Sequence, residues 1–265
     1  MREGGYRLAD RDCPVVGIGA SAGGLAALER FFEHVPPDTG AAYVVIQHSD
    51  PERPSAVAGI LAQHTPMPCV EVTAGTRLEP DHVYVLPPNT AAGLEGGRVQ
   101  LATPLPRGRR TLPIDAFFGA LGRALGERAV GVILSGSGGD GAAGLREINE
   151  NGGLVLAQAP ETADFDGMPR AAIDTGLVDI VVPVEDMPPR IAGFLSLASG
   201  EGEEGEEAGR LPAILALLRI QRGHDFRTYK PGTIRRRVAR RMGFLQIASL
   251  ADYLARLRRD AEEVD

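Results

Sequence analysis

Three residues of this chain have side chains that could together perform nucleophilic catalysis: Ser21, His48 and Asp140. A serine hydroxyl is a weak nucleophile until a base takes its proton and an acid orients that base. Ser21 lies in GASAG (19–23), which is a GxSxG pattern. This pattern points to a nucleophile only where a strand passes through a sharp turn into a helix. The sequence predicts that context, because a buried strand over residues 15–18 precedes apolar residues at helical spacing.

The same turn has two other interpretations. Gly17, Gly19 and Gly23 form a GxGxxxG variant between strand and helix, and helix N-termini attract phosphate through their unpaired N–H groups. A dinucleotide site would also require an acidic residue at the end of the second strand, which instead runs into His48. Alternatively, Ser21 could simply cap the helix that follows it. The turn alone leaves all three interpretations open.

The base and the acid are predicted from their positions after other strands. His48 follows a strand predicted over residues 41–47, and Asp140 follows another over residues 129–136, in a second glycine-rich turn. The carboxyl ends of parallel strands share one edge of the sheet, where ligands bind. His48 could there take the proton of Ser21 while Asp140 orients the imidazole ring. Each also has a structural interpretation. Lone histidines are usually structural or solvated, and Asp140 is a candidate N-cap for a helix predicted over residues 140–153.

Alternating strand and helix patterns predict the elements that would position these side chains. Over residues 13–197 they are typical of an α/β, doubly wound, mostly parallel sheet with helices on both faces, a three-layer arrangement. Within it, residues 94–103 predict a hairpin. Residues 198–210 contain five Glu and four Gly without a large apolar residue, which predicts a flexible acidic linker. Residues 211–265 show only helical patterns and predict a small all-α domain.

Composition excludes several classes of protein. The 265 residues include no Trp and 5% aromatic residues, which argues against base-stacking platforms for single-stranded nucleic acid. The two cysteines form neither a CxxC pair nor a zinc-ligand pattern, and no apolar run approaches the ~18 residues of a membrane span. We therefore expect a cytoplasmic protein with reduced thiols. Residues 211–265 carry 12 Lys and Arg against 6 Asp and Glu, whereas the rest carries 16 against 29, which suggests two units with different partners.

Four motifs together resemble the catalytic domain of CheB-type chemotaxis methylesterases: GIGASAGG, VVIQHSDP, ILSGSGGDGAAGL and GMPRAAIDTGLVDIVVP. They occur in the family's order over about residues 15–195. The resemblance implies a hydrolase of glutamate methyl esters on chemoreceptors, in a chemotaxis-type adaptation system, and many members also deamidate receptor glutamines. It implies Ser21 as nucleophile, His48 as base and Asp140 as orienting acid, with no cofactor or metal for the esterase domain.

Two departures from the family bear on the oxyanion hole. Members often have Thr where this chain has Ala22, and Met in the turn where it has Ser137 or Gly138. Backbone N–H groups would then be left to stabilise the oxyanion. Stand-alone members also carry an N-terminal receiver domain, and the short segment before the first strand predicts that this control is absent from the chain.

Residues 217–244 resemble the N-terminal helical domain of CheR-type receptor methyltransferases, notably in GHDF, YK and RRRVARRM. Proteins that fuse an esterase to a methyltransferase have this order. We therefore expect a fragment of such a fusion, with S-adenosylmethionine bound only by a methyltransferase domain that follows residue 265. Arg236 with Arg240, and Arg237 with Arg241, form a basic face at helical spacing. That face could be solvated, could dock on glutamate-rich receptor helices, or could contact nucleic acid.

Two functions therefore compete. The first is an esterase whose partners are the cytoplasmic helices of methyl-accepting chemoreceptors, with neither nucleic acid nor direct membrane insertion. The alternative is a non-catalytic receptor- or nucleotide-binding module that uses the glycine-rich turn. Fluorophosphonate labelling of Ser21 would indicate the esterase, and nucleotide-dependent thermal stabilisation without labelling would indicate the binding module.

Overall fold

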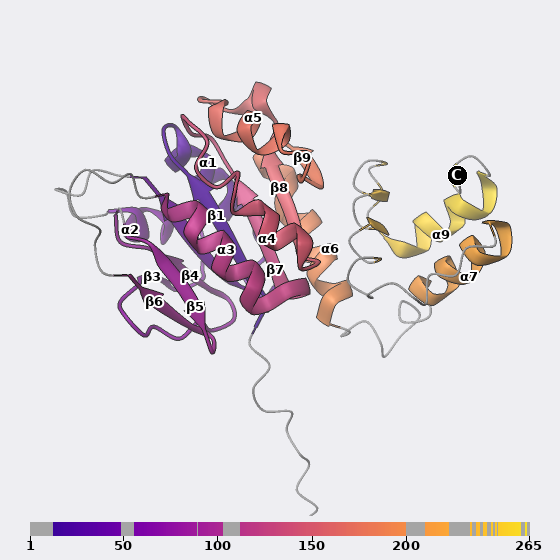
Figure 1. Ribbon diagram of the computed structural model, residues 1–265, viewed down its shortest axis with the longest axis horizontal. Coiled ribbons are helices and arrows are strands. Elements are labelled where there is room, and N and C mark those ends of the chain that lie inside the picture. The colour runs from indigo at the N-terminus through magenta and orange to yellow at the C-terminus, as the bar shows by residue number, and fades with distance from the viewer. Residues whose placement is uncertain are drawn as a thin grey trace, which may run out of the picture.

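The structure, a computed structural model (Figure 1), describes most of the chain. The described residues are 13–48, 56–88, 90–102, 112–199, 210–222 and 249–260, with positions 234, 237, 238, 241, 242, 245, 247 and 263. Between residues 13 and 199 the described chain forms an α/β domain, and from residue 210 onward it is helical.

Seven parallel strands form the central sheet in the order β3-β4-β2-β1-β7-β8-β9. The strands are β1 (Val15–Ala20), β2 (Ala42–Gln47), β3 (Cys69–Glu71), β4 (His82–Val85), β7 (Ala129–Ile133), β8 (Leu154–Gln158) and β9 (Ile180–Val182). The central strands are buried on both faces, which explains their nearly continuous apolar sequences. The strand order reverses between β1 and β7. In sheets of this kind such a reversal opens a crevice at the carboxyl ends of the strands, where ligands bind.

Helices cover both faces of the sheet, which confirms the predicted doubly wound, three-layer arrangement. One face packs against α1 (Gly24–Glu33), α2 (Val57–Leu61) and α6 (Met187–Ser199). The other packs against α3 (Pro113–Leu125), α4 (Leu145–Glu150) and α5 (Gly167–Asp174). On the α1 face, Phe31, Phe32 and Tyr43 meet edge to face with ring centroids 5.3–6.4 Å apart, which fixes α1 against β2.

Smaller elements complete the domain. The predicted hairpin is confirmed as β5 (Ala92–Glu95) and β6 (Arg98–Leu101). Its two turn residues, Gly96 and Gly97, have φ values of 53° and 69°, as a tight two-residue turn requires. Three 3₁₀ helices follow other elements: η1 (Gly126–Arg128), η2 (Pro160–Thr162) and η3 (Val184–Asp186). The edge strand β3 was not predicted, because it is three residues long and largely exposed.

The helix expected after Asp140 starts later than predicted. The sequence predicted a helix over residues 140–153 with Asp140 as its N-cap. Instead, α4 begins at Leu145, its N-cap is Gly144, and no side chain caps it. Asp140 therefore does not cap the helix that follows it, and its carboxylate binds other groups.

The C-terminal unit is helical, as predicted, with α7 (Arg210–Arg222) and α9 (Leu250–Arg259) contributing to an apolar cluster. Ser249 caps α9, because its Oγ accepts the N–H of Asp252 at 3.1 Å. Helices reach both ends of the predicted linker, since α6 runs to Ser199 and α7 starts at Arg210. The remaining linker residues, 200–209, lie outside the described residues.

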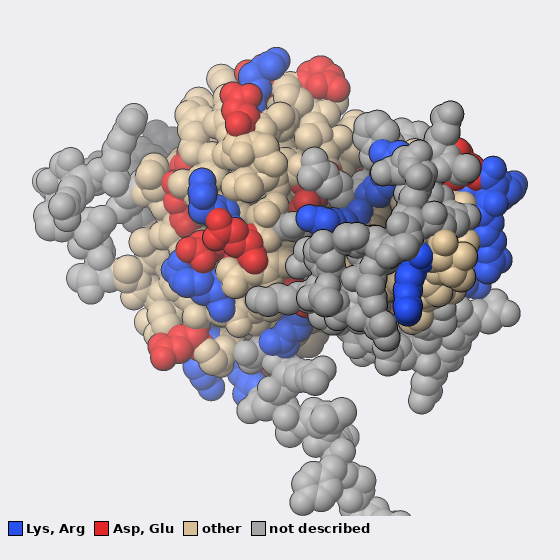
Figure 2. Space-filling model, turned by 45° about the vertical axis from the view of Figure 1, so that its right-hand side comes forward, with Lys and Arg blue, Asp and Glu red and all other residues tan. Residues whose placement is uncertain are grey.

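Charge differs between the two units. Figure 2 shows Lys, Arg, Asp and Glu side chains interspersed over the sheet domain, and mainly Lys and Arg among the described side chains of the C-terminal unit. The last turn of α9 contributes Arg256, Arg258 and Arg259. None of the helices within the described ranges is both long and apolar enough to cross a membrane.

Candidate active site

Ser21 lies in the short turn between β1 and α1. The helix begins at Gly24, its N-cap is Gly23, and no side chain caps it. The interpretation of Ser21 as the helix cap is therefore wrong. The left-handed backbone conformation falls on Gly23, at a φ of 67°, and not on Ser21. A glycine two residues after the serine thus makes the sharp turn, because only glycine adopts that conformation without a steric penalty.

The N–H groups of this turn are only partly used. Ser21 donates its N–H to the carbonyl of Ser135 at 3.0 Å, and Gly24 donates to the carbonyl of Ser21 at 2.9 Å. Within the part of the chain that the structure describes, the N–H groups of Ala22 and Gly23 have no hydrogen-bond acceptor. Unpaired N–H groups at the start of a helix attract negative charge. Two such donors therefore lie next to the Ser21 hydroxyl in the chain.

Strand pairing brings Ser21 and His48 next to each other. In the register of β1 and β2, Ala20 lies opposite Gln47, and the N–H of His48 donates to the carbonyl of Ala20 at 3.1 Å. Ser21 and His48 are the next residues on these two strands, whose backbones run about 4.8 Å apart.

Both side chains project from the same face of the sheet. Side chains alternate along a strand, so residues two positions apart share a face. Gly19 faces α3, since a Cβ there would lie 2.6 Å from Ile114. Ile46 belongs to the apolar cluster on that same face. Continuing the alternation, Ser21 and His48 lie on the α3 side of the sheet edge.

Asp140 contacts His48 directly. Nε2 of His48 lies 2.7 Å from Oδ2 of Asp140, whose side chain is 4% exposed. The same oxygen accepts the N–H of Ile114 at 3.2 Å, and Oδ1 accepts the N–H of Asp115 at 3.0 Å. Asp140 therefore caps the first turn of α3, a helix that precedes it by some two dozen residues in the chain.

This contact determines which ring nitrogen could act as a base. A carboxylate can only accept hydrogen bonds, so the proton of a neutral His48 lies on Nε2 and the lone pair on Nδ1. Nδ1 is then the nitrogen that could take a proton from Ser21. Among the described residues, Asp140 is the hydrogen-bond partner of the His48 ring, and no hydrogen bond joins that ring to the Ser21 hydroxyl.

Two known protein families match different parts of this chain. Residues 16–191 match the family described as CheB methylesterase, and residues 211–265 match the all-alpha domain of CheR methyltransferase. The chain belongs to the CheB methylesterase family. Along the chain, a CheB methylesterase domain is thus followed by the all-alpha domain of a CheR methyltransferase, which confirms both resemblances.

Individual proteins and one solved structure are also similar to this chain. The protein-glutamate methylesterase/protein-glutamine glutaminase of Moorella thermoacetica is 38% identical over 71% of this chain and 45% of its own length. The 104.1 kDa protein in the hypE 3′ region of Rhodobacter capsulatus is 39% identical over 78% of this chain and 24% of its own. The crystal structure of the Thermotoga maritima CheB methylesterase catalytic domain matches with a TM-score of 0.63 and 27% identity, over 68% of this chain and 97% of that one. The chain spans about half or less of the length of these curated relatives.

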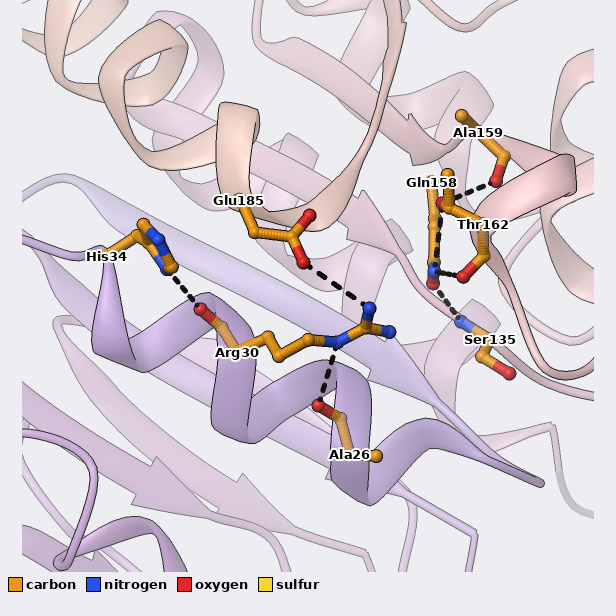
Figure 3. Close-up of polar contacts among 8 residues, drawn as sticks. All are labelled: Ala26, Arg30, His34, Ser135, Gln158, Ala159, Thr162 and Glu185. Carbon is orange, nitrogen blue, oxygen red and sulfur yellow. Dashed lines mark hydrogen bonds and ion pairs between the residues drawn. The ribbon is translucent and has the colours of Figure 1, made fainter.

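Ser135, which follows β7 in the CheB domain, binds the turn that carries Ser21. Its Oγ donates to the carbonyl of Ala22 at 2.9 Å and accepts the N–H of Phe165 at 3.0 Å. Its N–H donates to Oε1 of Gln158 at 2.9 Å, and Figure 3 shows the Gln158 amide lying between Ser135 and Thr162. Because Ser135 and Gln158 are buried, these bonds are shielded from water and hold the turn in place.

Gly136 allows a close approach beside the serine. A Cβ at this position would lie 2.9 Å from Cβ of Ser21 and 2.1 Å from Sδ of the buried Met168. Farther from the turn, Arg30 in the last turn of α1 pairs with Glu185 of η3 at 3.3 Å (Figure 3). Both side chains of this pair are partly exposed, so it adds little to the hold on Ser21.

Sequence reasoning missed the supporting residues Ser135, Gln158 and Asp115. The one sequence pattern that could have found Gln158 is a polar residue at the end of a buried strand, the same position that Gln47 has before His48. The hydrogen bonds of Ser135 and Asp115 join loops that are far apart in the chain, so no local sequence pattern predicts them.

The predicted basic face is only partly described. Arg236 and Arg240 lie outside the described residues. Arg241 donates to both carboxylate oxygens of Glu263, at 2.6 and 2.9 Å. Arg241 is thus paired and not simply solvated. No group of three or more His, Cys, Asp or Glu in the described ranges is arranged to hold a metal ion.

Proposed function

We propose that this chain is a protein-glutamate methylesterase whose catalytic residues are Ser21, His48 and Asp140. The observation that carries the proposal is the 2.7 Å contact between His48 and Asp140, at the sheet edge where Ser21 is the neighbouring residue. The names of the relatives add the substrate class, a glutamate methyl ester in a protein. The reaction uses side chains and backbone N–H groups of this chain, together with water, and needs no cofactor.

In the first half of the reaction, Nδ1 of His48 takes the proton of Ser21 as Oγ attacks the ester carbonyl. The N–H groups of Ala22 and Gly23 stabilise the oxyanion that forms, and Asp140 stabilises the imidazolium. As the carbon–oxygen bond to the methoxy group breaks, His48 gives its proton to that oxygen, and methanol leaves. The substrate is now a glutamyl ester of Ser21.

In the second half, water replaces methanol. His48 takes a proton from the water as its oxygen attacks the glutamyl ester, and returns that proton to Oγ of Ser21 when the ester bond breaks. Free glutamate side chain and free serine result. A glutamine side chain can follow the same course, with ammonia leaving in place of methanol, which would give the glutaminase activity named for the relatives.

The partners follow from the substrate. We propose that the substrate glutamates lie on the cytoplasmic helices of a methyl-accepting chemoreceptor, and that the enzyme works in the cytoplasm in a chemotaxis-type adaptation system. The match of residues 211–265 to the CheR all-alpha domain supports a joint role of the two units in setting receptor methylation. The domain limits 13–197, 198–210 and 211–265 remain predictions.

The test is methanol release from methylated receptor by the full chain. Ser21→Ala should lower kcat by at least about 10³-fold, as loss of a nucleophile does in other serine hydrolases. Ser249→Ala makes the same chemical change at the cap of α9 and should leave kcat unchanged. Equal rates for wild type and Ser21→Ala would contradict the proposal.

Labelling separates this function from the alternative. A fluorophosphonate should modify the wild-type chain at Ser21, as peptide mapping would show, and should not modify Ser21→Ala. The unpaired N–H groups of Ala22 and Gly23 also suit a phosphate. Thermal stabilisation by nucleotides without labelling would therefore favour the nucleotide-binding module over the esterase.

A further inference from the structure

Asp115 and Asp140 cap each other's backbone. Asp115 lies in the first turn of α3 and donates its N–H to Oδ1 of Asp140 at 3.0 Å. In return, Oδ1 of Asp115 accepts the N–H of Gly141 at 2.9 Å and that of Gly144 at 2.8 Å. One residue thus binds both the carboxylate of Asp140 and the turn that carries it.

Glycines make this contact possible. A Cβ on Gly144 would lie 2.7 Å from the carbonyl oxygen of Asp115 and 2.8 Å from Cβ of Phe118. A Cβ on Gly141 would lie 2.5 Å from Ile133 and 2.7 Å from Ile114. Without side chains at these positions, the turn packs directly against the start of α3, and its N–H groups reach the Asp115 carboxylate.

The arrangement brings two carboxylates close together. Burial raises the pKa of Asp115 and the charge of Asp140 adds to this, while hydrogen bonds from the N–H groups of Gly144, Gly141 and Ala143 lower it. The two carboxylates repel each other, while the first turn of α3 and the N–H groups of Gly141 and Gly144 favour a negative charge at Asp115. The Asp115 carboxylate fixes the backbone of the turn that carries Asp140, and the Asp115 N–H binds the Asp140 carboxylate itself.

We propose that Asp115 is a positioning residue, which holds the turn after β7 so that the Asp140 carboxylate stays against Nε2 of His48. The inference rests on the proposed function, because the contact between Asp140 and His48 matters for catalysis only if these residues act with Ser21. Without the acceptor of Asp115, the N–H groups of Gly141 and Gly144 would turn toward water and carry Asp140 with them. A displacement of about 1 Å at such a site can cost on the order of 10²-fold in rate.

Two substitutions of Asp115 separate the acceptor from the charge. Asp115→Ala removes the acceptor and should lower kcat roughly 10- to 100-fold with KM unchanged. Asp115→Asn keeps a carbonyl oxygen, and the N–H groups of Gly141 and Gly144 both donate to the single atom Oδ1, so kcat should stay close to wild type. Methanol release by the full chain measures both.

A readout independent of activity is the proton between His48 and Asp140, which should give a downfield imidazole N–H resonance by NMR, assigned with His48→Asn. Asp115→Ala should lose that resonance, and Asp115→Asn should keep it. If the wild-type chain releases no methanol but Asp115→Ala still loses the resonance, the proposed function fails and the positioning role stands.

The matched control is Asp179→Ala. Oδ2 of Asp179 accepts the N–H of Val155 at 3.0 Å, at the start of β8, and therefore at the opposite edge of the sheet. This variant loses a buried carboxylate and should keep the His48 resonance. Retention of the resonance and of kcat in Asp115→Ala would overturn the proposal, and so would loss of the resonance in Asp179→Ala, because the effect would then be general destabilisation.

Discussion

The turn after β1 and the turn after β7 meet at one edge of the sheet, and both are rich in glycine, yet they use their backbone N–H groups in opposite ways. In the first, the N–H groups of Ala22 and Gly23 have no acceptor in the described chain. In the second, the N–H groups of Gly141 and Gly144 are both bound by Asp115.

This difference shows that two glycine-rich turns in one site can have different roles, depending on whether their N–H groups are paired. Unpaired N–H groups can stabilise a charge that appears only during the reaction, which suits the turn that carries Ser21, the proposed nucleophile. Paired N–H groups fix the backbone, which suits the turn that carries Asp140, the proposed orienting acid. The same residue type gives a binding turn in one place and a rigid support in the other.

Among changes to the glycines and supporting residues of the two turns, we expect the largest effect from a side chain added at Gly23 in the first turn. A Cβ at Gly23 would lie 2.7 Å from Cβ of Asp164 and 2.8 Å from Oγ of Ser135, at a φ of 67°. Gly23→Ala must therefore displace the turn and should lower kcat by about 10²- to 10³-fold, as loss of an oxyanion donor does. Gly40→Ala, at a φ of 72° with open space around it, should leave kcat unchanged. Equal kcat values for the two variants would show that the geometry of the first turn does not matter for the reaction.

The second turn offers a matched pair of glycines with the same φ of 99°. Gly141 is packed against Ile133 and Ile114, whereas nothing lies within 4 Å of a Cβ on Gly138. Both alanine variants should lose about 1–3 kcal/mol from backbone strain, and Gly141→Ala should lose about 1–3 kcal/mol more from overpacking. Chemical denaturation measures both, and equal losses would show that the second turn is not held by packing against α3.

The smallest effect concerns the charge of Asp115. Its pKa in the folded protein is raised above the ordinary value of 3.8, mainly by burial. The folded state therefore binds this proton more tightly than the unfolded state, and the associated stability is lost as pH rises through the folded pKa. Asn cannot ionise, so Asp115→Asn should gain stability relative to wild type between about pH 4 and pH 7. Denaturation curves across that range would contradict this if the difference between the two proteins shrank.

The sequence was sufficient for the fold of the sheet domain and the helical nature of the C-terminal unit. Apolar runs such as those of β1 and β7 indicate burial directly, because a strand covered on both faces is mostly apolar. The sequence also placed Ser21, His48 and Asp140 after strands, and parallel strands bring such positions to one edge. The short edge strand β3 and the late start of α4 were missed, because local preference is weak there and packing decides.

The sequence by itself determined which side chains stand at the carboxyl ends of β1, β2 and β7, since strand pattern and turn glycines are properties of neighbouring residues. Only the tertiary structure decided that Asp140 caps α3 instead of the helix after it. It also decided that the Asp115 carboxylate accepts hydrogen bonds from the turn that carries Asp140. The physical reason is that a hydrogen bond depends on a few tenths of an ångström between atoms, and the packing of α3 against the turn after β7 sets that distance.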